Sequence, residues 1–232
     1  MNVKQFRYSL VNLGYLIYSQ KSALVVDGGA IDALLSFLDE NNLELKYVAN
    51  THAHPDHTSG TQALLKGTDA LYLDNRTLLD EKVITLDDDV INVYHTPGHS
   101  HDSVTFHLDN IFISGDTLFN ATVGNCFTGD LKGFYDSIKM LLSFPDETIV
   151  YAGHDYVKES IAFAKSVDPD NRDLDAFSKK YDPDHVWSTL GEERKINPFL
   201  RFNEKPIISY LEKRGYPVGT EYERWESVMD LD

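Results

Sequence analysis

One seven-residue segment restricts the fold of this chain more than any other feature. Residues 51–57, Thr-His-Ala-His-Pro-Asp-His, place three imidazoles and a carboxylate within six positions, directly after a predicted strand. Alternation in an extended segment lets His52 and His54 point to one side. Asp56 and His57 lie beyond the proline and can turn toward a second ion. Imidazole and carboxylate are the usual ligands of hydrolytic zinc, so the segment predicts a metal site rather than a polar loop with incidental histidines.

Three glycine-led pairs follow other predicted strands: Gly98-His99, Gly115-Asp116 and Gly153-His154. A glycine before a ligand suits a tight turn or a close backbone approach. Each pair alone is weak evidence, because a single histidine after a strand is more often structural. Together with the first segment they predict one site from His52, His54 and His99, a second from Asp56, His57 and His154, and Asp116 as a bridge between them.

A bridging carboxylate lowers the repulsion between two cations about 3.5 to 4 Å apart, and such a pair traps a water between the ions. Two Lewis acids lower the pKa of that water, so a hydroxide nucleophile exists at pH 7 without a separate general base. We therefore expect two divalent metal ions, zinc first, with iron or manganese as alternatives because such ligands accept all three. Asp56 and Asp116 are the expected catalytic carboxylates.

The order of predicted elements indicates the fold class. Runs rich in β-branched and aromatic residues predict strands, and apolar residues at helical spacing predict helices. Strands are predicted at 3–10, 13–18, 23–26, 46–49, 70–73, 83–86, 90–94, 104–108, 111–113 and 148–151, and helices at 31–38, 61–66 and 131–142. Meandering strands with few helices favour two packed sheets flanked by helices over one parallel sheet.

The pattern changes near residue 165, where strand signals end. Helices are predicted at 158–167, 170–180, 189–196, 205–212 and 221–229. Thr189 and Glu192 fit a capping box at the start of the third of these helices. The sequence therefore predicts a catalytic domain at 1–165 and a small helical domain at 166–232.

Charge and apolar content exclude several functions. The formal charge of −16 argues against nucleic acid as a partner, because phosphate binding needs clustered lysine and arginine. No apolar run reaches the roughly 18 to 20 residues that span a bilayer, and no secretory signal follows the N-terminus. The single cysteine, Cys126, fits a reducing compartment. We expect a cytoplasmic protein without a membrane partner, whose oligomeric state the sequence does not fix.

The metal motifs resemble those of the metallo-β-lactamase superfamily in order and spacing. The resemblance implies an α+β fold, the four-layer αββα sandwich, and the same seven ligands. It also matches Asp27 to an aspartate behind the metal ligands, which would orient a metal-bound histidine. Within the superfamily, residues 115–119, 153–156 and 197–201 and the helical appendage are similar to glyoxalase II, the hydroxyacylglutathione hydrolases.

That similarity implies hydrolysis of a 2-hydroxyacyl thioester, such as S-D-lactoylglutathione, by attack of a metal-bridging hydroxide on the thioester carbonyl. The products are a 2-hydroxy acid and a free thiol, which leaves readily because thiol pKa values lie near 8.5. The small-molecule thioester is the expected partner. The family's carrier-binding segment falls on residues 124–127, so Asn125 and Phe127 are expected to contact substrate. Tyr156 matches a family tyrosine and is expected there too, or else caps a helix.

Two departures concern the thiol carrier. Asn125 and Phe127 replace a basic residue and a tyrosine, and the basic residues of the family's C-terminus have no counterpart except Arg224. Each lost partner of an anionic ligand weakens binding by about 1 to 3 kcal/mol. A hydrolase for a non-glutathione thioester is therefore an alternative. Trp225, with Phe199 and Phe202, fits a carrier-binding wall less well than core packing.

The sequence supports three other functions less well. A mononuclear iron enzyme that oxidises persulfides shares the fold, but those enzymes lack the helical extension with Asn-Pro-Phe that this chain has at 197–199. A phosphodiesterase is disfavoured by the charge. A catalytically idle metal-binding protein is the remaining alternative, although a closed structural zinc site normally uses four ligands without a shared carboxylate.

Overall fold

The apolar runs of the N-terminal part form a mixed five-stranded sheet in the computed structural model, which describes residues 1–231. The strands lie in sequence order: β1 (Asn2–Tyr8), β2 (Asn12–Tyr18), β3 (Ser22–Val26), β4 (Glu44–Ala49) and β5 (Leu71–Leu73). The first three are antiparallel, and β3, β4 and β5 are parallel. Helices α1 (Ile31–Glu40) and α2 (Thr61–Gly67) make the parallel connections.

The second sheet has the spatial order β11-β10-β9-β8-β7-β6. Its strands are β6 (Val83–Leu86), β7 (Asp89–His95), β8 (Val104–Leu108), β9 (Ile111–Gly115), β10 (Ile149–Ala152) and β11 (Ser188–Thr189). Strands β6 to β9 form an antiparallel meander. Helix α4 (Leu131–Leu141) connects β9 to β10, which is parallel to it.

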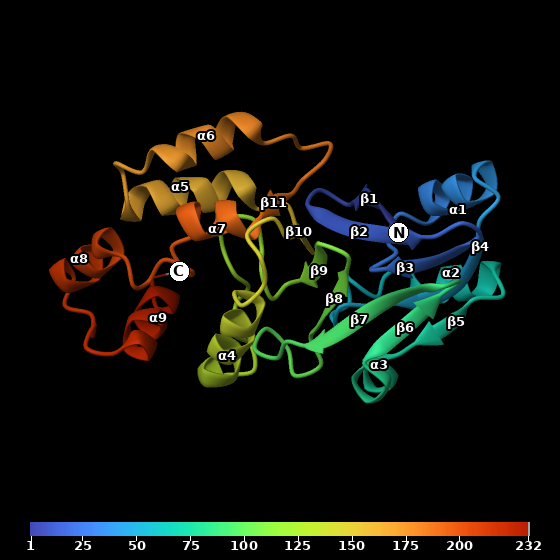
Figure 1. The fold of residues 1–232 in the computed structure, drawn as a ribbon, viewed down its shortest axis with the longest axis horizontal. Coiled ribbons are helices and arrows are strands. Elements are labelled where there is room, and N and C mark those ends of the chain that lie inside the picture. Colours follow the sequence, from blue (N-terminus) through green and yellow to red (C-terminus); the bar gives the residue numbers. More distant parts are fainter. Residues whose placement is uncertain (232) are drawn as a thin grey trace.

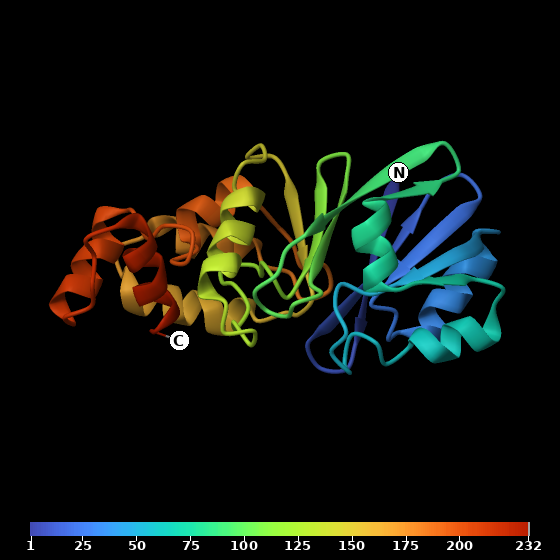
Figure 2. The same ribbon diagram turned by 90° about the horizontal axis from the view of Figure 1, so that it is seen from below.

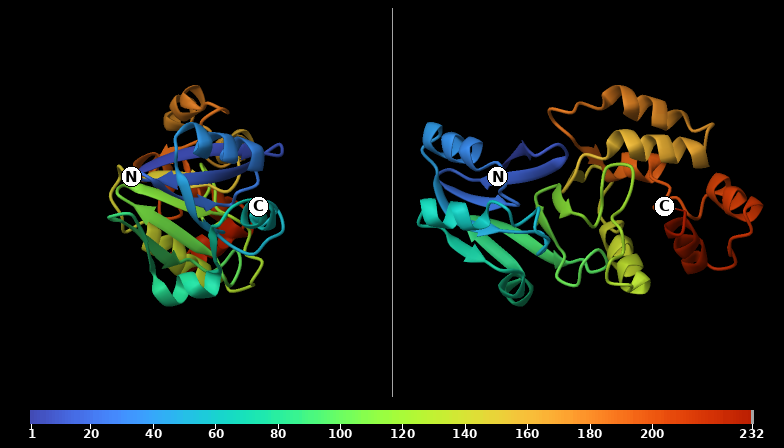
Figure 3. Two further views of the ribbon diagram at one scale, coloured as in Figure 1. Left: turned by 90° about the vertical axis from the view of Figure 1, so that its right-hand side faces the viewer. Right: turned by 180° about the vertical axis from the view of Figure 1, so that it is seen from behind.

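Alternating side chains of the strands build the layers seen in Figures 1 and 3. In the first sheet, Leu16 and Val25 face outward and share a buried cluster with α1 and α2. Their neighbours Ile17 and Leu24 face inward and pack against the second sheet. In the second sheet, the outward Phe112 packs with α4. This two-residue period confirms the αββα sandwich.

The C-terminal helices gather at the end of the molecule away from α1 and α2 (Figure 2). They are α5 (Val157–Val167), α6 (Arg172–Lys180), α7 (Leu190–Ile196), α8 (Lys205–Lys213) and α9 (Glu221–Met229). The predicted division between residues 165 and 166 falls inside α5. The region also contributes β11 to the second sheet, so its backbone continues the sandwich.

The predicted strands and helices are present, with ends that differ by a few residues, and the capping box of Thr189 and Glu192 is confirmed. Two elements escaped prediction: the short helix α3 (Asn75–Glu81) and the two-residue strand β11. Trp225 is fully buried in the core, which confirms core packing over a carrier-binding wall. Among residues 1–231, no helix is long and apolar enough to cross a membrane.

Candidate metal centre

The structure brings the seven predicted ligands together at one edge of the two sheets. The loop between β4 and α2 carries four of them, and the loops after β7, β9 and β10 carry one each. Five of the seven are buried, whereas His54 is half-buried and Asp56 is exposed. Their potential ligand atoms form three overlapping groups, each within 4.8 Å: His52, His54 and His99; His52, His57 and Asp116; Asp56, His57 and His154.

The first group is an all-nitrogen cluster. His54 Nδ1 lies 2.9 Å from His52 Nε2 and 3.0 Å from His99 Nε2. A single nitrogen carries at most one proton, so it cannot form a proper hydrogen bond to both neighbours as a donor. One cation among the three nitrogens satisfies all of them.

The third group, of Asp56, His57 and His154, combines two imidazoles with a carboxylate. His57 Nε2 lies 3.1 Å from His154 Nε2. Asp56 Oδ2 lies 3.6 Å from His57 Nε2 and 3.3 Å from His154 Nε2. Asp56 is the most accessible of these side chains, with 49% of its side chain exposed, so this group faces the open side of the centre.

Asp116, a member of the second group, lies between the first and the third. Its Oδ2 is 3.4 Å from His99 Nε2 and 3.3 Å from His154 Nε2, and its Oδ1 is 3.3 Å from His57 Nε2. Asp116 therefore contacts a nitrogen of each predicted site, as a bridging carboxylate must. Although Oδ1 is buried, it accepts no hydrogen bond within the described residues. A buried carboxylate oxygen without a donor is well satisfied by a cation.

Hydrogen bonds on the outer side of the rings orient three imidazoles. His99 Nδ1 donates to the Asn125 carbonyl oxygen (3.0 Å), and His57 Nδ1 donates to Asp27 Oδ2 (2.9 Å). The hydroxyl of Thr51 donates to Asp27 (2.7 Å), which leaves its oxygen free to accept from His52 Nδ1 (3.1 Å). With the outer nitrogens acting as donors, the inner Nε2 lone pairs point into the centre.

The carboxylates control the charge of the metal-free centre. Burial lowers the pKa of His57, but Asp27 and Asp116 outweigh burial and raise that pKa to about 11. Burial and the nearby His57 lower the pKa of His52 to about 4. Burial raises the pKa of Asp116, yet its contacts with His154 and His57 hold the pKa far below its usual range. The centre therefore keeps anionic oxygens and a proton that a cation replaces.

The glycines before the ligands allow the close approach expected of them. A Cβ on Gly153 would lie 2.2 Å from Asp116 Oδ1 and 2.8 Å from a carbon of His57. Gly115 has a positive φ of 52°, and its Cβ would meet Thr51 at 2.5 Å. Side chains at these positions would push ligands out of place.

Sequence reasoning missed several residues that support the centre. Asn12 Nδ2 donates to Asp56 Oδ2 at 2.9 Å, and Thr51 binds Asp27 through both its amide and its hydroxyl. Phe119 packs against His154. Thr51 is the first residue of the histidine segment, so its position was a usable signal. Nothing in the sequence connects Asn12 with Asp56, because the two are 44 residues apart.

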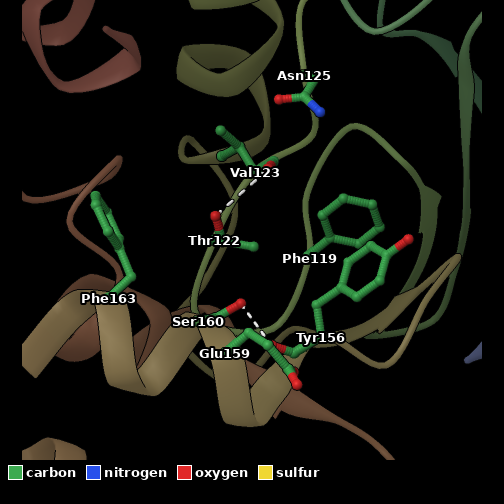
Figure 4. Close-up of a pocket in the computed structure, with 8 residues that line it drawn as sticks. All are labelled: Phe119, Thr122, Val123, Asn125, Tyr156, Glu159, Ser160 and Phe163. Atoms are coloured by element: carbon green, nitrogen blue, oxygen red, sulfur yellow. Dashed lines mark hydrogen bonds between the residues drawn. The ribbon is translucent and has the colours of Figure 1, made fainter. Parts of the chain in front are cut away.

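The predicted substrate residues flank the centre on two sides. Tyr156 stacks on His154, with ring centroids 5.1 Å apart, and lines a pocket together with Asn125 and Phe119 (Figure 4). Phe127 instead lies over His99 and His54, at 5.1 and 5.9 Å between centroids, and lines a separate open pocket. The structure therefore brings Tyr156 and Asn125 together and sets Phe127 apart from them.

Comparison with known families divides the chain at the start of the helical region. Residues 10–73 and 71–154 match the metallo-beta-lactamase superfamily. Residues 155–227 match the family described as the hydroxyacylglutathione hydrolase C-terminus.

Curated relatives cover most of the chain. The hydroxyacylglutathione hydrolase of Pseudoalteromonas translucida is 32% identical over 225 residues, covering 90% of this chain and 88% of the relative. That of Chromohalobacter salexigens is 31% identical over 210 residues, covering 83% of this chain and 82% of the relative.

Solved structures share the fold. ETHE1 from Myxococcus xanthus has a TM-score of 0.73 and 24% identity, covering 99% of this chain and 90% of its own. TTHA1623, solved in a di-iron-bound form, has a TM-score of 0.60 and 25% identity, covering 84% of this chain and 98% of its own.

Proposed function

Because this chain belongs to the hydroxyacylglutathione hydrolase family of the metallo-β-lactamase superfamily, and is thus a metal-dependent thioester hydrolase, we propose that it holds two ions and cleaves a 2-hydroxyacyl thioester. The products are a 2-hydroxy acid and a free thiol. Zinc is the proposed metal, since histidine and carboxylate suit it, and iron or manganese would fit the same ligands. The free Cys126 fits the cytoplasm as its compartment.

The convergence of the inner histidine nitrogens supports two ions. His52, His54 and His99 are the proposed ligands of one ion, and Asp56, His57 and His154 those of the other. Asp116 is the proposed bridge, because its two oxygens contact nitrogens of both groups. Such ions supply a water of lowered pKa and polarise the substrate carbonyl.

The residues around the ions keep this arrangement in place. Asp27 fixes the ring of His57, and the Asn125 carbonyl fixes that of His99. Tyr156 stacks on one face of His154, and Phe119 packs against the same ring in an edge arrangement. Preorganised ligands lower the reorganisation that the reaction needs.

The two pockets suggest how a thioester lies across the centre. We assign the pocket of Tyr156 and Asn125 to the thiol arm, because it opens between the metal centre and α5, the first of the C-terminal helices. The pocket of Phe127, His54 and His99 is left for the acyl group. A thioester whose carbonyl lies above Asp116 would then place its thiol arm in the first pocket and its acyl group in the second.

Metal content and thioester hydrolysis test the proposal together. The purified protein is expected to hold about two metal ions per chain and to hydrolyse lactoyl thioesters. Asp116→Asn is expected to lose both the second ion and the activity. His95→Ala is the matched control, since His95 is exposed, lies outside the three groups of potential ligands and bonds through its ring to the His101 carbonyl. One iron per chain, together with oxygen consumption on a persulfide, would overturn the proposal of a thioester hydrolase with two ions.

A further inference from the structure

We propose that the thiol carrier of this enzyme has an uncharged, amide-containing arm, without the carboxylates of glutathione. This inference rests on the proposed function, because it concerns the pocket assigned to the thiol arm. It is carried by the composition of that pocket and by the positions of the nearby cations.

The pocket beside Tyr156 contains no positive charge. Its volume is about 200 Å³, which is enough for part of a thiol arm rather than for a whole substrate. Figure 4 shows the rings of Phe119 and Tyr156 on one side and Phe163 on the other, with Asn125 at the far end. Glu159 on α5 is the one charged residue among those that line it. An anionic arm would therefore meet an acid and no base.

The cations of α5 are engaged away from the pocket. The ammonium of Lys158 lies over the ring of Tyr181, 5.8 Å from its centroid. Lys165 pairs with Asp175 on α6 at 2.6 Å. Neither residue lines the pocket, although both project from the helix that forms its floor.

Two arginines of the C-terminal region have structural partners. Arg201 pairs with Asp168 at 2.8 Å and with Glu204 at 2.7 Å. Arg224, the one candidate for a carrier contact in α9, donates to Asn203 Oδ1 and to the Val218 carbonyl. Recruiting either arginine to a carboxylate would break these bonds, so neither offsets the missing bases.

The remaining polar groups suit amides. Asn125 offers an amide that both donates and accepts. Ser160 donates its hydroxyl proton to the Tyr156 carbonyl, which leaves its oxygen to accept from an N–H. Between these groups the walls are aromatic or aliphatic. An arm of alternating methylene and amide units satisfies both kinds of wall without a charge.

A pair of matched substrates tests the inference. N-acetyl-S-D-lactoylglutathione is compared with its diamide, in which primary amides replace both carboxylates at nearly constant size. Acetylation removes the ammonium from both compounds, so the diamide is uncharged. For the metal-loaded wild type, kcat/KM on the diamide is expected to exceed that on the acid at least about tenfold, since two repulsive charges are removed. A faster reaction with the acid would overturn the inference, and the proposed thioester hydrolysis would still stand.

A charge reversal locates the preference. Glu159→Lys is expected to reduce the diamide-to-acid ratio about fivefold to tenfold. Glu212→Lys, at an exposed glutamate of α8, is the control and should keep the wild-type ratio. An unchanged ratio in Glu159→Lys would contradict the assignment of this pocket to the arm.

Binding of unreactive thioethers separates the two proposals. Calorimetry with N-acetyl-S-methylglutathione and its uncharged diamide reports the pocket's preference whether or not hydrolysis occurs. Tighter binding of the diamide supports the inference, and tighter binding of the acid overturns it. A protein that prefers the diamide yet hydrolyses neither thioester would refute the proposed function alone.

Discussion

The side chain of Asn12, in the first hairpin, donates a hydrogen bond to the Asp56 carboxylate in the metal centre. Asp56 is the exposed one among the seven predicted ligands, so this bond restrains its carboxylate more than packing does. Asn12→Ala is expected to weaken binding of the second ion about tenfold to a hundredfold, as loss of such supporting contacts does, and to spare the first ion. Stepwise zinc affinities from chelator competition measure this.

Asn41→Ala is the matched control, because the side chain of Asn41 donates to a helix carbonyl on the surface, that of Phe37. Two ions bound with unchanged affinity in Asn12→Ala would show that Asp56 needs no such restraint.

Glu193 is a fully buried acid on α7, and its carboxylate accepts the amide of Ala121 and the side chain of Asn197. Burial outweighs these bonds and raises its pKa from 4.5 to about 7. A raised folded-state pKa stabilises the fold fully below pH about 4.5, and this contribution is lost as pH rises through about 7.

Glu193→Gln removes this titration. Relative to the variant, the wild type is expected to lose up to about 3 kcal/mol of unfolding free energy between pH 4.5 and 8. Urea denaturation with excess chelator at both pH values measures the difference without metal release. Parallel pH profiles for wild type and variant would contradict it, and exposed Glu212→Gln is the control.

At the scale of elements, two helices begin with the same capping box. Thr189 accepts from the Glu192 amide at the start of α7, and Thr220 accepts from the Glu223 amide at the start of α9. Thr189→Ala and Thr220→Ala are each expected to lower stability by about 1 kcal/mol, because each leaves helix amides without partners. Chemical denaturation measures both.

Serine restores the capping oxygen, so Thr189→Ser and Thr220→Ser are the matched controls and should stay near wild type. An alanine variant as stable as its serine counterpart would show that water replaces the cap.

At the scale of the whole molecule, one core joins the sandwich to the helical region. Trp225 of α9 packs edge-on against Phe134 and Tyr135 of α4, which also covers the second sheet. Trp225→Ala is expected to cost about 3 to 5 kcal/mol and to lower the melting of the entire chain in one transition. Calorimetry measures the number of transitions.

Phe127→Ala is the stability control, since that ring is 67% exposed. A separate early transition in Trp225→Ala, with the rest of the chain unchanged, would show that the helices fold as an independent unit.

The sequence by itself determined the sandwich and the candidate ligands. Two-residue alternation specifies which face of each strand is buried, and the clustered histidines have few structural uses. Short elements escaped because α3 and β11 offer too few residues for a period to show.

Only the tertiary structure decided which groups stand behind the predicted ligands and which charges face the pocket beside Tyr156. Asn12 reaches Asp56 because the first residue of β2 pairs with His154, a contact between distant segments. Lys158 and Lys165 turn away from the pocket through partners on and after α6. Local sequence sets periodicity and composition, whereas long-range packing sets the direction of each side chain, and pocket chemistry depends on direction.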